Sequence, residues 1–154
     1  MKILIVDNNP EQLGLMTRTA DFLGYTADVA RDGSEAIQCH IQYPHDLILL
    51  SLDLDDYDGF STAQALRQLE RTQPGCPPSL ICGLARCFDA HLHENCLKNG
   101  MNTCVLKPAT TRGAIELIVS MRKDTWRFRQ GNDIYSKSAA CRSRGGTSCL
   151  ILKH

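Results

Sequence analysis

The chain has 154 residues, of which 43% are hydrophobic and 22% charged, a composition typical of a globular domain with a buried core. Its longest apolar runs, such as 3–6 and 47–50, span four residues, against the roughly 20 that a membrane-spanning helix needs. The first residues also lack the apolar segment of a signal peptide. We therefore expect a soluble, cytoplasmic protein that makes no membrane contact.

Charge is unevenly distributed along the chain. Residues 1–120 hold 9 Lys and Arg against 15 Asp and Glu, whereas residues 121–154 hold 8 against 2. Residues 123–154 are also rich in polar and turn-forming residues, which predicts a flexible basic tail behind a domain over residues 1–122. Such a tail, with Trp126 and other aromatic residues, allows a nucleic-acid-associated regulator, but it lacks the helix–turn–helix pattern of DNA-binding output domains.

Apolar runs and helical stretches alternate five times. Buried strands are predicted at 2–6, 25–30, 46–50, 79–84 and 102–106. Helices are predicted at 10–23, with Asn9 as N-cap and Pro10 in the first turn, and at 34–42, 60–69, 89–97 and 110–122. Strands without polar alternation indicate a parallel sheet covered on both faces. Five such units favour an α/β flavodoxin-like sheet in the order 2-1-3-4-5 over a closed eight-stranded barrel.

Eight cysteines are present, and without a secretion signal we expect them to remain reduced. The tightest cluster of possible metal ligands is Cys87, His91, His93 and Cys96. On a continuous helix, the first two would face one side and the last two nearly the opposite side, so one tetrahedral ion could not reach all four. No metal is expected there.

In a sheet of this kind, ligands collect beyond the carboxyl ends of the strands. The residues expected at that edge are Asp7, Asn8 and Asn9, the segment 51–58, Ala85 and Arg86, and Lys107 with Pro108. Four acidic residues lie within the second of these segments. We interpret that segment as a solvated acidic turn.

Three segments carry a resemblance to a known family. KILIVDNNP at 2–10, DLILLSLDLDDYDGF at 46–60 and GMNTCVLKP at 100–108 are together similar to the receiver domain of two-component response regulators (the CheY-like family). The third segment is most similar to receiver domains of hybrid sensor histidine kinases. The resemblance covers residues 1 to about 122 and leaves out the tail.

The resemblance implies transfer of a phosphoryl group from a phosphohistidine to an aspartate. In the family, two acidic residues after the first strand help to hold Mg²⁺, and an aspartate ending the third strand is the nucleophile. A Thr or Ser after the fourth strand bonds the phosphoryl group, a Lys after the fifth neutralises it, and an aromatic residue in the fifth strand moves. In that order, the matching residues here are Asp7 and Asn8, Ser51, Ala85, Lys107 and Cys104.

Four of these positions depart from the family pattern, which indicates a pseudo-receiver. A serine hydroxyl needs a base to attack phosphorus, whereas a carboxylate does not. With Asn8 and Ser51 in place of acids, Mg²⁺ binding is expected to be weak or absent, with Asp7 and Asp53 as weak candidate ligands. We expect Lys107 to pair with Asp7, and we expect no catalytic residue, no cofactor and no enzymatic activity.

The expected function is therefore phosphorylation-independent protein binding in two-component (phosphorelay) signalling. By resemblance, the interaction face is formed by the fourth helix, fifth strand and fifth helix, here Phe88, His91, Met101, Cys104 and Arg112. Candidate partners are a histidine kinase, a phosphotransfer protein, another response regulator or a second copy of the chain. The first strand begins at residue 2, which favours a free-standing protein. The alternatives are a working receiver phosphorylated at Asp53 or another acid, and the nucleic-acid-associated regulator.

Overall fold

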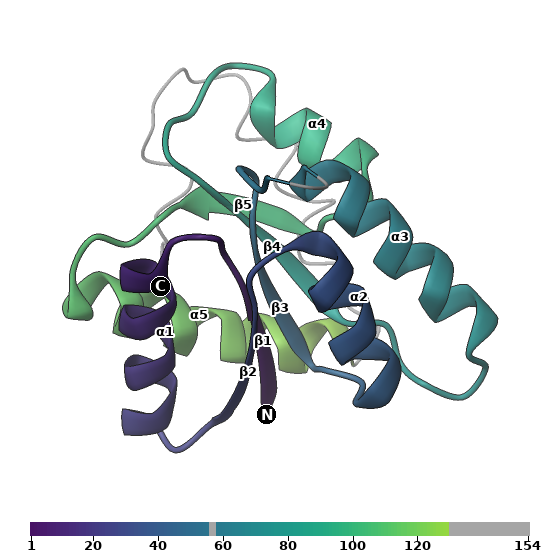
Figure 1. Ribbon diagram of the computed structural model, residues 1–154, viewed down its shortest axis with the longest axis horizontal. Coiled ribbons are helices and arrows are strands. Elements are labelled where there is room, and N and C mark those ends of the chain that lie inside the picture. The colour runs from purple at the N-terminus through teal and green to yellow at the C-terminus, as the bar shows by residue number, and fades with distance from the viewer. Residues whose placement is uncertain (56–57, 130–154) are drawn as a thin grey trace.

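Five parallel strands form one sheet in the order β2-β1-β3-β4-β5 in the computed structural model, which describes residues 1–55 and 58–129 (Figure 1). The strands are β1 (Lys2–Val6), β2 (Thr26–Ala30), β3 (Leu47–Ser51), β4 (Leu80–Ala85) and β5 (Thr103–Leu106). The helices are α1 (Pro10–Phe22), α2 (Gly33–Gln42), α3 (Gly59–Thr72), α4 (Leu92–Lys98) and α5 (Thr111–Arg129). This topology confirms the predicted flavodoxin-like sheet.

Helices cover both faces of the sheet, as the unbroken apolar strands predict. Ile3 and Leu49 contribute to a core shared with α1 and α5, whereas Leu4 and Leu50 contribute to a second core shared with α2, α3 and α4. Figure 1 shows these two helical layers on opposite sides of the strands. Successive side chains of a strand point to opposite faces, so a buried strand must be apolar at every position.

Several helix ends differ from the prediction, including the end of α3, which continues to Thr72 beyond the predicted 69, the start of α4 and the end of α5. α4 begins at Leu92, because the carboxylate of Asp89 accepts a hydrogen bond from the backbone N–H of His91 (2.8 Å) and holds this segment in a turn. α5 continues to Arg129, beyond the predicted end at residue 122. The first residues of the predicted tail are thus helical, and 130–154 lie outside the described residues. Among the described helices, none combines the length and apolar character that a membrane span requires.

Local sequence features fix the turns at the carboxyl edge of the sheet. The side chain of Asn9 caps α1 by accepting hydrogen bonds from Glu11 N (2.9 Å) and Gln12 N (3.3 Å), as predicted. Gly59 begins α3 so close to β3 that an added Cβ would lie 2.5 Å from the carbonyl oxygen of Ser51. Only glycine allows that approach, and it places the start of α3 against the end of β3.

Candidate functional site

The carboxyl ends of β1, β3, β4 and β5 bring together the four central positions of the predicted site. Asp7 follows β1, Ser51 ends β3, Ala85 ends β4 and Lys107 follows β5. These strands are neighbours in the sheet, and Ala85 is paired in register with Leu106, directly before Lys107. The sequence therefore predicted this convergence correctly.

Asp7 and Lys107 form an ion pair across this edge, which confirms the predicted pairing. Lys107 Nζ lies 2.9 Å from Asp7 Oδ2, and the two side chains are 12% and 0% exposed. The other carboxylate oxygen, Oδ1, accepts the backbone N–H of Asn9 at 2.9 Å. Among the described residues, Oδ2 has no aligned hydrogen-bond donor, so at this oxygen Lys107 acts as a buried counter-charge.

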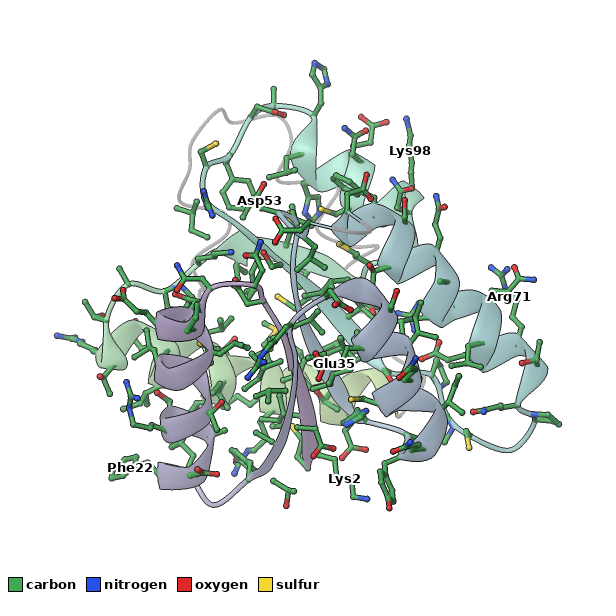
Figure 2. All side chains as sticks on the ribbon, viewed as in Figure 1. Lys2, Phe22, Glu35, Asp53, Arg71 and Lys98 are labelled. Atoms are coloured by element: carbon green, nitrogen blue, oxygen red, sulfur yellow. The ribbon has the colours of Figure 1, made fainter. Side chains whose placement is uncertain are left out.

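Ser51 is fully buried at the end of β3. Its hydroxyl lies 3.4 Å from the carbonyl oxygen of Asp53, to which it can donate, and 3.3 Å from the Asp53 N–H, from which it accepts. The Asp53 carboxylate is half exposed and pairs with the exposed Arg86 at 3.5 Å. Figure 2 shows Asp53 in the loop beyond the strand ends. Two residues after Ser51, the chain has already left the sheet and turned to solvent.

Ala85 supplies only a methyl group to the site. Its side chain is buried, and its carbonyl oxygen accepts the backbone N–H of Lys107 at 2.8 Å. That bond continues the pairing of β4 with β5 and fixes where Lys107 leaves the sheet. The position therefore has a structural backbone role but offers no side-chain hydroxyl to an anion.

The predicted interaction face needs a correction at two residues. Met101 and Cys104 are 3% and 0% exposed, so neither can contact a partner on the surface. The turn after α4 folds back, with Met101 N donating to Cys96 O at 3.0 Å, and this carries both side chains beneath the helix. His91 and Arg112 are exposed as predicted and Phe88 is partly exposed. Sequence reasoning missed the exposed apolar side chain of Leu106 on the edge strand.

The four cysteine and histidine residues considered as metal ligands do not lie on one continuous helix, as had been expected. Cys87 and His91 precede α4, whereas His93 and Cys96 lie within it. In the described ranges 1–55 and 58–129, no group of three or more such side chains is arranged to hold a metal ion. His93 instead contacts Cys104, with its Nδ1 3.8 Å from the sulfur.

A buried pair of histidines, which the sequence did not predict, lies near the amino end of β3, away from the site. His40 Nδ1 lies 3.3 Å from His45 Nδ1, so one ring must donate and the other accept. His45 Nε2 contacts Asp28 at 2.8 Å, and His40 Nε2 lies 3.8 Å from Glu70. Burial lowers the pKa of His40, and the Glu70 carboxylate only partly offsets this. No sequence spacing marks contacts of this kind.

Comparison with known proteins identifies the family. Residues 3–119 match the family model described as the response regulator receiver domain. The chain belongs to that family. As a receiver domain, it is a component of two-component signalling, and its five-stranded topology agrees with this assignment.

Hybrid sensor kinases are among its relatives. The receiver is 33% identical over 110 residues to the sensor protein EvgS of Escherichia coli K12, covering 71% of this chain but 9% of that protein. It is 31% identical over 110 residues to the sensor histidine kinase RcsC of Salmonella typhimurium, covering 71% of this chain and 11% of that protein. The chain thus spans about a tenth of the length of these relatives.

Solved structures show the same fold. The chemotaxis protein CheY4 of Vibrio cholerae matches with a TM-score of 0.69 at 20% identity, covering 79% of this chain and 96% of CheY4. A second match, with a TM-score of 0.70 at 20% identity, covers 78% of this chain and 87% of the other. It comes from the co-crystal structure of the Saccharomyces cerevisiae phosphotransfer protein Ypd1 with the receiver domain of the response regulator Ssk1.

Proposed function

We propose that this receiver is a pseudo-receiver: it does not accept a phosphoryl group and acts in two-component signalling as a phosphorylation-independent protein-binding module. The observation that carries the proposal is Ser51. This residue ends the third strand, where the family resemblance places the phosphoacceptor aspartate, and it is fully buried with its hydroxyl facing the backbone of Asp53. A neutral hydroxyl there requires a general base before it can attack phosphorus.

The electrostatics of the site support the same proposal. Lys107, which would neutralise an incoming phosphoryl group, is already paired with the buried Asp7 carboxylate at 2.9 Å. An anion would have to compete with that carboxylate for the ammonium group. Ala85 offers no hydroxyl that could compensate by bonding the anion.

The residues present do not fit the Mg²⁺ ion that receiver domains require for phosphoryl transfer. Mg²⁺ binds hard oxygen ligands and favours carboxylates. Of the three positions that would supply them, only Asp7 carries a carboxylate, since Asn8 and Ser51 are neutral. Both Asp7 oxygens are already in polar contact, one with Asn9 N–H and one with Lys107. We therefore derive no metal-dependent step for this chain.

Asp53 is the competing phosphoacceptor candidate. Its carboxylate faces Arg86 in the exposed loop, and it lies beyond the strand end rather than between Asp7 and Lys107. In-line attack on a phosphoryl group held by Lys107 would require this loop to rearrange. The arrangement favours the pseudo-receiver, and phosphorylation of Asp53 is the outcome that would replace it.

The surface formed by α4, β5 and α5 is the proposed binding face. Its exposed residues include His91, Leu106 and Arg112. The partner class we propose is a histidine kinase, a phosphotransfer protein or another response regulator. The structural match from the Ypd1–Ssk1 co-crystal supports a phosphotransfer protein within that class, because the receiver domain named there was crystallised with one.

Mass spectrometry after incubation with acetyl phosphate and Mg²⁺ tests the proposal. We expect the wild-type chain to gain no phosphoryl mass. A triple variant carrying Asn8→Asp, Ser51→Asp and Ala85→Thr restores the family residues and serves as the positive control. Phosphorylation of the wild type that is abolished by Asp53→Asn would refute the pseudo-receiver and establish a displaced phosphoacceptor.

Binding of a purified phosphotransfer protein provides the second arm of the test. Isothermal titration calorimetry measures the affinity with and without acetyl phosphate and Mg²⁺. The proposal predicts the same dissociation constant under both conditions. A change that depends on the phosphodonor and on the receiver's own residues would contradict phosphorylation-independent binding.

A further inference from the structure

Two buried thiols meet between α4 and β5. Cys96 lies in the helix and Cys104 in the strand, both are 0% exposed, and both belong to the same core cluster. Their side chains share a hydrogen bond. Neither thiol has a role in the proposed binding function.

The surrounding backbone holds the two thiols together. Met101 N donates to Cys96 O at 3.0 Å, which returns the chain from the end of α4 to the start of β5. On the neighbouring strand, Gly83 leaves room for this packing, because a Cβ there would lie 3.3 Å from the Cβ of Cys104. The pair is therefore positioned by the α4–β5 turn and by the absence of a side chain at Gly83 in β4.

The two sulfurs differ in character. The hydrogen bond from Cys104 lowers the pKa of Cys96, whereas that bond, followed by burial, raises the pKa of Cys104. A thiolate is the reactive form of cysteine, so the direction of these shifts favours Cys96 as the attacking sulfur. His93, three residues before Cys96 in α4, also contacts this pair, with its Nδ1 3.8 Å from the Cys104 sulfur.

We propose that Cys96 and Cys104 form an oxidisable dithiol, which a peroxide converts into an intramolecular disulfide joining α4 to β5. The Cys96 thiolate attacks one oxygen of hydrogen peroxide and breaks the O–O bond, giving a sulfenic acid and a hydroxide that takes up a proton as water. The Cys104 sulfur then attacks the Cys96 sulfur and displaces its hydroxyl, which leaves with the Cys104 proton as a second water. Two thiols lose two electrons, and one peroxide becomes two waters.

Access to the buried pair depends on α4. This helix has only seven residues, and its N-cap residue, His91, makes no side-chain capping hydrogen bond. Short, uncapped helices open locally more readily than long ones. Oxidation of Cys96 is therefore expected to be slower than that of Cys87, which is exposed and directly precedes this segment. The disulfide would then fasten α4 covalently to the sheet.

Peptide mapping of the whole 154-residue chain tests the proposal. The native protein is treated with hydrogen peroxide, free thiols are alkylated, and the chain is cleaved with trypsin and chymotrypsin. Cleavage after Lys98 separates Cys96 from Cys104, and cleavage after Phe88 separates Cys87 from Cys96. We expect a linked Cys96–Cys104 peptide that dithiothreitol removes and that also forms in the matched Cys87→Ser variant.

A second variant follows the first chemical step. In Cys104→Ser, the sulfenic acid has no resolving thiol, so dimedone should label Cys96. If this variant does not fold, the wild-type map decides alone. A linkage of Cys104 to Cys87, or complete oxidation of Cys87 with Cys96 and Cys104 still alkylated as free thiols, would overturn the proposal.

Discussion

Replacing Lys107 by methionine tests the electrostatic description of the site. Methionine keeps much of the apolar stem of the side chain but removes the charge. Asp7 is fully buried, and Lys107 Nζ at 2.9 Å is its neighbouring cation. Among the described residues, Asp7 Oδ2 has no aligned hydrogen-bond donor that could take over this role. The substitution leaves a buried carboxylate with its Asn9 hydrogen bond but without its counter-charge.

Breaking a buried pair by removing one partner costs roughly 3–5 kcal/mol. For a chain of this size, a loss of that magnitude lowers Tm by about 6–20 °C. Urea unfolding followed by circular dichroism measures the change. The matched control is Lys98→Met, which breaks the exposed pair with Glu94 at 3.2 Å and should cost less than about 1 kcal/mol.

The double variant Asp7→Asn with Lys107→Met completes the test. Asparagine keeps the oxygen that accepts the Asn9 N–H and removes the buried charge, so most of the lost stability should return. A Lys107→Met variant less than about 1 kcal/mol below wild type, or a double variant no more stable than the single one, would show that Lys107 does not neutralise Asp7.

Three further predictions concern the α3 entry, the histidine pair and the binding face. Gly59→Ala should lower the free energy of unfolding by about 1–3 kcal/mol, because the added Cβ would lie 2.5 Å from a backbone oxygen. Gly14→Ala is the matched control: its Cβ meets only the flexible end of an arginine side chain, so it should raise the free energy of unfolding by about 0.5–1 kcal/mol. Equal effects of the two variants in urea unfolding would contradict this prediction. Because the pKa of His40 is lowered in the folded state, the unfolded chain takes up a proton first as pH falls. The free energy of unfolding should therefore decrease as pH drops below 6.5. If the dependence of that free energy on pH is unchanged in His40→Gln, His40 is not the group responsible. Leu106→Glu should weaken binding of the phosphotransfer protein tenfold or more in calorimetry. Val29→Glu, which is similarly exposed on the other edge strand, should leave the affinity unchanged. Equal weakening by both variants would refute the proposed binding face.

The sheet could be predicted because a doubly covered parallel sheet requires continuously apolar strands. Residues 47–50 show this most clearly, and all of β3 is buried. Helix ends were less predictable. Asp89 holds a turn through its side chain where a helical pattern had suggested a helix, and α5 continues to Arg129 through a segment whose polar composition had suggested a tail.

The site was predictable to the extent that strand order determines it. Asp7 and Lys107 are 100 positions apart, but both directly follow strands, so the topology brings them to one edge. Burial on the interaction face was not predictable in the same way. Met101 and Cys104 lie beneath α4 because of a turn geometry that sequence spacing does not specify. The His40–His45 contact likewise depends on packing between the end of α2 and the segment before β3.

The central claim of the proposal is that the carboxyl edge of the sheet in this receiver does not bind metal and phosphate. Amide NMR spectra with and without Mg²⁺ and beryllofluoride, which mimics an aspartyl phosphate, test it most directly. The pseudo-receiver predicts unchanged resonances at Asp7, Ser51, Asp53, Ala85 and Lys107, while the triple variant with restored family residues shifts. Localised shifts at these residues in the wild-type chain would contradict the claim and identify a working phosphorylation site.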